Sequence, residues 1–155
     1  MRNIIRDFKE IKRRNGYEAV LVLFSLYLER IAFVKTPFKI LKLFITRHYL
    51  CDISPYSFNS IEAIVTCKMP HPFMIIINSS TSIGNNSIIY HNVTIGNREG
   101  RHDASNGAFL GDNVFIGNTV SILGDVRIGN NVRIGSLSVI LKDIDNDQTI
   151  TGIYK

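Results

Sequence analysis

The sequence predicts a mainly β protein, a coil of stacked turns that follows a short α-helical segment at the N-terminus. Two observations carry this prediction: aliphatic residues recur every six positions from Ile77 onwards, and before residue 50 the apolar residues instead follow helical spacing. With 155 residues, 45% of them hydrophobic, the chain is long enough to bury a core and too apolar for a disordered protein.

The first 50 residues form a basic helical segment. Residues 3–14 and 17–34 have helical patterns, and a third, amphipathic pattern runs from Pro37, which either ends the second helix or opens the third, to about Tyr49. Residues 1–50 hold eleven Lys/Arg against four Asp/Glu, a balance of +7, whereas residues 51–155 carry −2. Such a segment is either a solvated helix surface or a contact for an anionic membrane, an acidic partner or nucleic acid.

The apolar run at residues 19–28 is ten residues long, whereas a membrane-spanning helix needs roughly 20. Two isolated cysteines, Cys51 and Cys67, suggest neither a disulfide framework nor a zinc site. We therefore expect a cytoplasmic protein without a secretory signal, with peripheral membrane contact through residues 1–50 as the alternative.

The six-residue repeat occupies the rest of the chain. Its aliphatic positions are Ile77, Ile83, Ile89 and Ile95, then Leu110, Ile116, Ile122, Ile128, Ile134 and Ile140. The step of fifteen between the two runs indicates a loop inserted at about residues 97–109. A period of six suits a triangular coil with three strands and about eighteen residues per turn. Glycine often follows the aliphatic position and asparagine recurs nearby, because both tolerate the positive φ of tight turns.

Three stretches, "DISP", "HPFMIIINSSTSIGNNSIIYHNVTIG" and "GDNVFIGNTVSILGDVRIGNNVRIGSLSVILKD", resemble the hexapeptide-repeat acyltransferases and, within them, the serine acetyltransferase group. The resemblance covers about residues 51–151. It implies a left-handed parallel β-helix domain at 51–155 after the helical segment 1–50. It also implies a homotrimer with its site between subunits, and acetyl-CoA as co-substrate without a metal.

Four residues match the group's functional positions. His71 matches the catalytic histidine, a general base whose pKa lies near working pH, and Asp52 matches the aspartate that orients it. The spacing between the two is longer here than in the group, and a short insertion near "SFNSIEAIV" would explain the difference. Arg101 and His102, in the inserted loop, resemble the pair that holds the amino-acid substrate and completes the site. Each has a plainer alternative, as a turn, cap or loop residue.

The remaining motifs indicate no other chemistry. The histidines are widely separated, the glycine-rich "GNREGRHD" lacks the ending of a phosphate-binding loop, and nothing suggests a nucleophile triad or nucleic-acid binding. We expect His91 and His48 to be exterior polar residues.

Three functions remain. The first is an acetyl-CoA-dependent O-acetyltransferase acting on a saccharide hydroxyl, favoured because the short helical segment and "NGAFLGDNVFIG" resemble sugar-directed relatives. The second is a serine O-acetyltransferase of cysteine biosynthesis, with Arg101 holding the carboxylate. The third is a non-catalytic β-helix scaffold.

Overall fold

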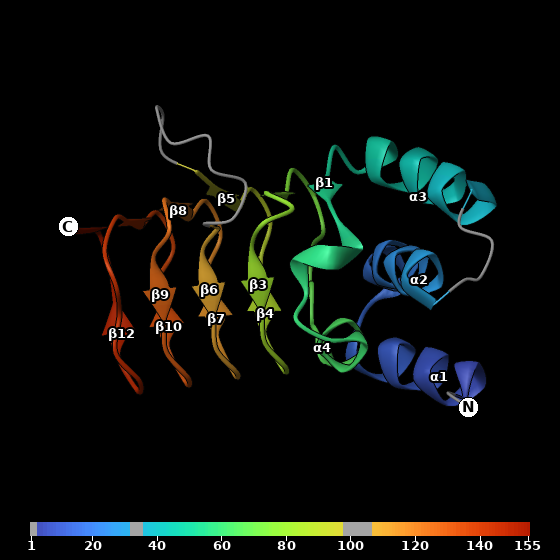
Figure 1. Cartoon of the computed structure of the whole chain (residues 1–155), viewed down its shortest axis with the longest axis horizontal. Helices are drawn as coiled ribbons and strands as arrows, with labels where there is room; N and C mark the ends of the chain where they lie inside the picture. Colours follow the sequence, from blue (N-terminus) through green and yellow to red (C-terminus); the bar gives the residue numbers. More distant parts are fainter. Residues whose placement is uncertain (1–2, 32–35, 98–106) are drawn as a thin grey trace.

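The computed structural model describes residues 3–31, 36–97 and 107–155. Helices cluster at one end of a long coil, and the C-terminus lies at the other (Figure 1). The elements are α1 (Ile4–Arg14), α2 (Tyr17–Ile31), α3 (Thr36–His48), β1 (Asp52–Ile53), η1 (Pro55–Ser57), α4 (Ile61–Thr66), β2 (Ile76–Ile77), β3 (Ser82–Ile83), β4 (Ile88–Ile89), β5 (Thr94–Gly96), β6 (Phe109–Leu110), β7 (Phe115–Ile116), β8 (Ser121–Leu123), β9 (Arg127–Ile128), β10 (Arg133–Ile134), β11 (Val139–Ile140), β12 (Thr149–Ile150) and β13 (Ile153–Tyr154).

The N-terminal helices lie where the sequence predicts them. Pro37 is the second residue of α3 and therefore opens this helix rather than ending α2; residues 32–34, at the predicted end of α2, are outside the described residues. None of the helices among the described residues is long and apolar enough to cross a membrane. The short elements η1 and α4 occupy the stretch where the sequence indicates an insertion, and Ser60 caps α4 by accepting a hydrogen bond from the Ala63 N–H.

The strands form three parallel sheets, which are the three faces of the coil. Their orders are β1-β2-β5-β8-β11-β13, β12-β10-β7-β4 and β3-β6-β9. Ile77 pairs with Ile95, and Ile116 with Ile134, eighteen residues further on. The ten repeat aliphatics are each the second residue of a strand, and none is more than 3% exposed. The predicted triangular coil with an aliphatic interior is therefore confirmed.

The glycines of the repeat have a different role from the one the sequence suggests. Gly84 and Gly111 do not have positive φ; a Cβ on Gly84 would lie 2.4 Å from the carbonyl oxygen of Gly111 in the next turn. They are needed because neighbouring turns approach closely, not because of turn conformation. In the repeat the positive φ falls instead on residues that include the asparagines Asn86, Asn113 and Asn131.

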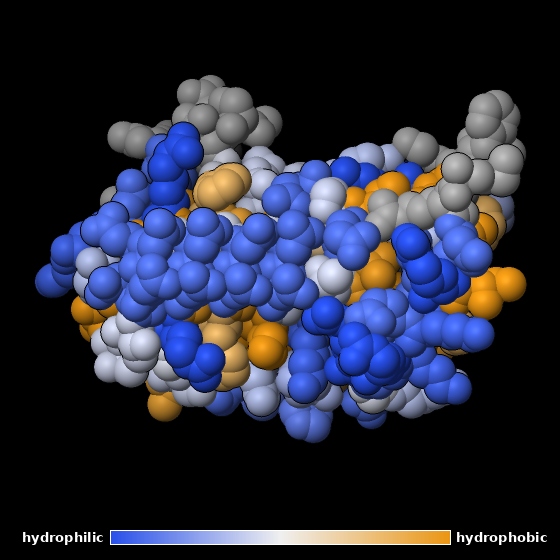
Figure 2. All heavy atoms as spheres, turned by 90° about the horizontal axis from the view of Figure 1, so that it is seen from below, coloured by the Kyte–Doolittle hydropathy of each residue, from blue (hydrophilic) through white to orange (hydrophobic). Residues whose placement is uncertain are grey.

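A ladder of Asn and Asp side chains runs along one corner of the coil. Asp112 Oδ1 accepts a hydrogen bond from the Asn85 N–H, Asn130 Oδ1 from the Asp112 N–H, and Asn146 Oδ1 from the Asn130 N–H, at 2.7–2.8 Å. Each side chain thus satisfies a backbone donor of the preceding turn. Figure 2, seen from below, shows a hydrophilic band that follows the coil.

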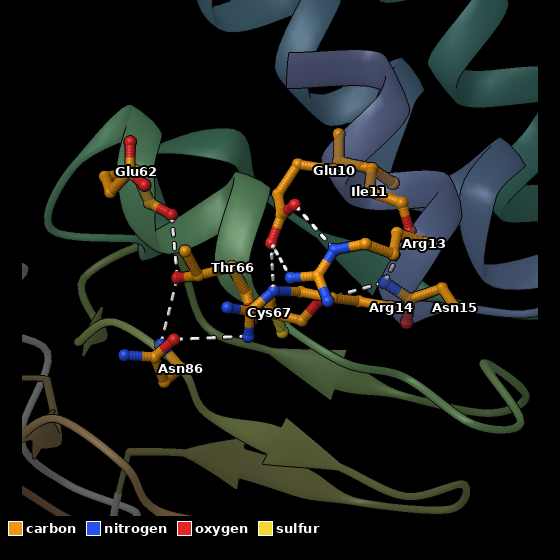
Figure 3. Close-up of polar contacts among 9 residues, drawn as sticks. All are labelled: Glu10, Ile11, Arg13, Arg14, Asn15, Glu62, Thr66, Cys67 and Asn86. Atoms are coloured by element: carbon orange, nitrogen blue, oxygen red, sulfur yellow. Dashed lines mark hydrogen bonds and ion pairs between the residues drawn. The ribbon is translucent and has the colours of Figure 1, made fainter. Parts of the chain in front are cut away.

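Polar contacts join α1 to α4 and to the first turns of the coil (Figure 3). Arg14 donates from its guanidinium to Glu10, to the Thr66 carbonyl and to Asn86 Oδ1. Asn15 Nδ2 donates to the Cys67 carbonyl at 3.0 Å, and Asn15 Oδ1 accepts from the Met69 N–H at 2.8 Å. These bonds fix the helical segment, which we call the cap, on the N-terminal end of the coil.

Candidate active site

The six-stranded sheet carries Asp52, one of the predicted site residues, on its first strand. Side chains that point outward from its first strands are Asp52, Ile76, Thr94 and Ser121, which stand side by side in the strand register. Where these strands end, a pocket of about 370 Å³ is lined by residues that include Lys42, Asp52, Thr94 and Gly96. Gly96 directly precedes the stretch in which the inserted loop begins.

His71 lies at the corner that leads into this sheet, where the chain is two residues longer than in the regular turn. Lys68 pairs with Ile88, twenty residues later, whereas Ile76 pairs with Thr94 after only eighteen. Within this longer corner, residues 71–73 form a tight turn, which the Phe73 N–H closes by donating to the His71 carbonyl at 2.8 Å. This turn leaves the His71 side chain exposed.

The next turn of the coil brings His91 beside His71. The two ring centroids are 6.1 Å apart and the rings are inclined at 69°. His91 is half-buried, and its Nδ1 is buried with no hydrogen-bond partner among the described residues. The sequence indicates an ordinary exterior residue at this position. The signal that could have revealed the pair is the spacing of twenty, one turn of eighteen plus the two-residue bulge.

The hydrogen bonds among the described residues include none between Asp52 and His71, and His71 is not among the residues that line the pocket. The turns of Asp52 and His71 are joined instead by Cys51, whose Sγ donates to the Pro72 carbonyl at 3.2 Å. Asp52 is one of the residues that line the pocket. The structure thus shows no hydrogen bond by which Asp52 would orient the His71 ring. Arg101 and His102 lie outside the described residues.

Lys42 is a pocket residue that the sequence does not reveal. Its Nζ lies 3.3 Å from Glu29 Oε2 and 3.5 Å from the Ile53 carbonyl oxygen. The side chain reaches the pocket from the inner side of α3, so that a cation stands on the same pocket wall as Asp52. A substrate carboxylate that entered this pocket would share Lys42 with Glu29.

Neither cysteine is suited to act as a nucleophile. Burial raises the pKa of the Cys51 thiol, and complete burial raises the pKa of Cys67 to about 12. Among the described residues, no three His, Cys, Asp or Glu side chains are grouped closely enough to hold a metal ion. The exposed imidazole of His71 is therefore the candidate group best suited to take a proton from a hydroxyl.

Comparisons with known proteins follow this geometry. Residues 107–142 match the family described as "Bacterial transferase hexapeptide (six repeats)". No curated protein matches the chain by sequence. The coil is therefore of the hexapeptide-repeat type over the matched residues.

Solved structures resemble the chain over almost its whole length. Serine acetyltransferase from Neisseria gonorrhoeae, in complex with serine, is 25% identical, with a TM-score of 0.72 over 96% of this chain and 65% of that one. Soybean serine acetyltransferase, in complex with serine, is 23% identical, with a TM-score of 0.75 over 96% of this chain and 65% of that one. Serine acetyltransferase isoform 3 from Entamoeba histolytica, in complex with cysteine, is 21% identical, with a TM-score of 0.68 over 95% of this chain and 56% of that one. The chain thus spans less than two thirds of these relatives, with which it shares a left-handed parallel β-helix preceded by helices.

Proposed function

We propose that this hexapeptide-repeat protein is an acetyl-CoA-dependent O-acetyltransferase and that its acceptor is the hydroxyl of L-serine. The observation that carries the proposal is the likeness to serine acetyltransferases, which extends through both the cap and the coil and covers 96% of the chain in a relative crystallised with serine. The sequence favours a saccharide acceptor, but the neighbours support its alternative, serine, better.

His71 is the proposed general base. Its imidazole takes the proton of the serine hydroxyl while the hydroxyl oxygen attacks the thioester carbon of acetyl-CoA. The C–S bond then breaks, and the thiolate of CoA receives the proton from the imidazolium, so that the products are O-acetylserine and CoA. The exposed position of His71 on the two-residue bulge supports this role, because the acceptor can approach the ring from solvent.

The polar residues around His71 have separate proposed roles. Asp52 is proposed to orient the His71 ring and to stabilise the imidazolium by its charge, as the sequence resemblance implies. Lys42 is a second candidate, beside Arg101 in the inserted loop, for binding the serine carboxylate. We further propose a homotrimer in which a neighbouring subunit completes the acetyl-CoA site, as the sequence resemblance implies.

The test is release of free CoA thiol from acetyl-CoA, with and without L-serine, in the wild type, His71→Ala and His48→Ala. We expect serine-stimulated release that falls by about 100-fold or more in His71→Ala, as for loss of a general base. The matched control, His48→Ala, removes an exposed histidine on α3 and retains the activity.

Each other outcome identifies an alternative. Release that depends on His71 but ignores serine contradicts the serine acceptor, and a panel of saccharides then tests the hydroxyl acceptor that the sequence favours. If sedimentation velocity shows the wild-type protein to be folded and trimeric but it releases no CoA, the result contradicts the proposed enzymatic activity. It then favours the non-catalytic scaffold. Wild-type turnover in His71→Ala removes this histidine from the mechanism.

A further inference from the structure

The cap exposes a broad apolar surface on α3. Ile40, Leu43 and Phe44 are 51%, 61% and 72% exposed. Leu41, beside them, leads into an apolar groove of about 510 Å³ between the three N-terminal helices. The groove walls include Phe8, Tyr17, Leu21, Phe24, Leu41 and Ile45. We call Ile40, Leu41, Leu43, Phe44 and this groove the apolar face of the cap.

Two polar residues of α3, Lys42 and Thr46, face inward, whereas the apolar Ile40, Leu43 and Phe44 face outward. The buried residue of α3 is Thr46, whose hydroxyl donates to the Lys42 carbonyl at 2.9 Å. Lys42 itself points inward to its ion pair with Glu29. In an ordinary surface helix the apolar stripe packs on the core and the polar side is solvated. The outward position of Ile40, Leu43 and Phe44 leaves the apolar face of the cap without a covering element among the described residues.

Exposed cations border this surface. Lys39 and Arg47 stand on α3 beside Leu43, and Lys12 lines the groove on the α1 side. These three side chains make no ion pair with another described residue. Because helical residues are spaced by 100°, Lys39 and Arg47 lie on either side of Leu43 on the outer surface of α3.

Most carboxylates of the cap are already neutralised by internal partners. Glu10 accepts hydrogen bonds from Arg13 and Arg14 (Figure 3), which lower its pKa to about 2. Asp7 is buried and accepts a hydrogen bond from the Tyr27 hydroxyl, and Glu29 pairs with Lys42. The cations that border the apolar face are therefore not offset by nearby free acids of the described cap, except for Glu18, which is exposed.

We propose that the apolar face of the cap docks on an anionic lipid surface, a role separate from acetyl transfer. Leu43 and Phe44 enter the boundary between headgroups and acyl chains, and the bordering cations contact lipid phosphates. α3 has thirteen residues, and it lies in the plane of the membrane rather than across it. A second copy of the cap fits this surface less well, because two identical faces would bring their positive borders together.

The test is flotation of the full-length protein with vesicles of phosphatidylcholine alone and with 30% phosphatidylglycerol, in about 0.1 M salt. We expect binding to the anionic vesicles that weakens at about 0.5 M salt. The double variant Leu43→Ser/Phe44→Ser should weaken binding by at least about tenfold, because the side chains it shortens enter the lipid. Lys39→Ser/Arg47→Ser should weaken it by roughly twenty- to thirtyfold, at about fivefold per cation.

The matched control is Leu137→Ser, which removes a side chain that is 72% exposed, but on the coil; it should bind as wild type does. Far-UV circular dichroism verifies that every variant remains folded. Absence of flotation, equal binding to both vesicle types, or binding unchanged in Leu43→Ser/Phe44→Ser overturns the proposal. A second copy is the occupant instead if the wild type does not float but associates in a concentration-dependent way in sedimentation velocity. The variant Leu43→Ser/Phe44→Ser should then abolish this association.

Discussion

Replacement of Asn15 by alanine should loosen the cap from the coil. Asn15 is the C-cap residue of α1 and bridges to the segment after α4, through Cys67 and Met69. Both of these partners are completely buried. The amide therefore satisfies one donor and one acceptor that water reaches poorly in the folded protein.

The magnitude follows from these two bonds. An unsatisfied buried N–H, here that of Met69, costs about 1–3 kcal/mol, and loss of the bond to the Cys67 carbonyl adds about 0.5–1.5 kcal/mol. We expect Asn15→Ala to lower the free energy of unfolding by about 1.5–4.5 kcal/mol. The matched control is Asn59→Ala, which removes an exposed amide without a hydrogen bond to another described side chain and should change stability by less than about 0.5 kcal/mol.

Two assays separate global from local loosening. Urea unfolding followed by circular dichroism gives the global change. Alkylation of Cys67, resolved from Cys51 by peptide mass spectrometry, reports opening of the cap junction, and a junction weakened by about 2 kcal/mol should label roughly 30-fold faster. An Asn15→Ala protein that unfolds like wild type and protects Cys67 equally well would show that these hydrogen bonds do not hold the cap.

Three further predictions concern packing and ionisation. Gly111→Ala places a Cβ 2.4 Å from Asn130 Oδ1 and should destabilise the coil by about 1–3 kcal/mol in thermal unfolding, whereas Gly16→Ala, with nothing within 4 Å, should not. Hydrogen bonds from two arginines lower the pKa of Glu10 from 4.5 to about 2. Glu10 therefore stabilises the fold fully above pH 4.5 and loses this contribution as pH falls towards 2. An NMR titration of the Glu10 carboxyl checks the midpoint. Burial raises the pKa of Cys67 from 9.0 to about 12, so its contribution to stability is lost as pH rises from 9 towards 12, and urea unfolding across that range should show the decline.

The coil could be predicted from the sequence because one physical requirement recurs. Each strand must turn an aliphatic side chain such as Ile116 or Ile134 inward at the same step, and the period of six shows both the strands and the three faces. The reason why glycines recur in the repeat could not be predicted from its period. The contact that excludes a side chain at Gly111 involves Asn130, from the next turn, and a single period does not show how closely turns approach.

The candidate site was predictable only in part. The resemblance to a known family singles out His71, whose role remains a prediction, but not the bulge on which it stands. That bulge depends on the pairing of Lys68 with Ile88, and only this pairing brings His91 into contact with His71. Lys42 escaped notice because an amphipathic helix is expected to hold its lysines outward, whereas α3 turns Lys42 towards Glu29.

For the proposed acetyltransferase, the architecture also indicates where acceptor preference would be encoded. The inward positions of the strands accept only side chains that fill the interior of the coil, and aliphatic residues occupy them along its whole length. These positions therefore cannot distinguish one substrate from another. Outward strand positions such as Thr94 and the corner residues His71 and His91 are free of that constraint. If the acceptor is selected at the corner, His91→Gln should change the ratio of serine to saccharide acetylation while leaving the unfolding midpoint unchanged. An exchange confined to inward residues, such as Ile95→Val, should lower stability by about 0.5–1.5 kcal/mol and leave this ratio as it is.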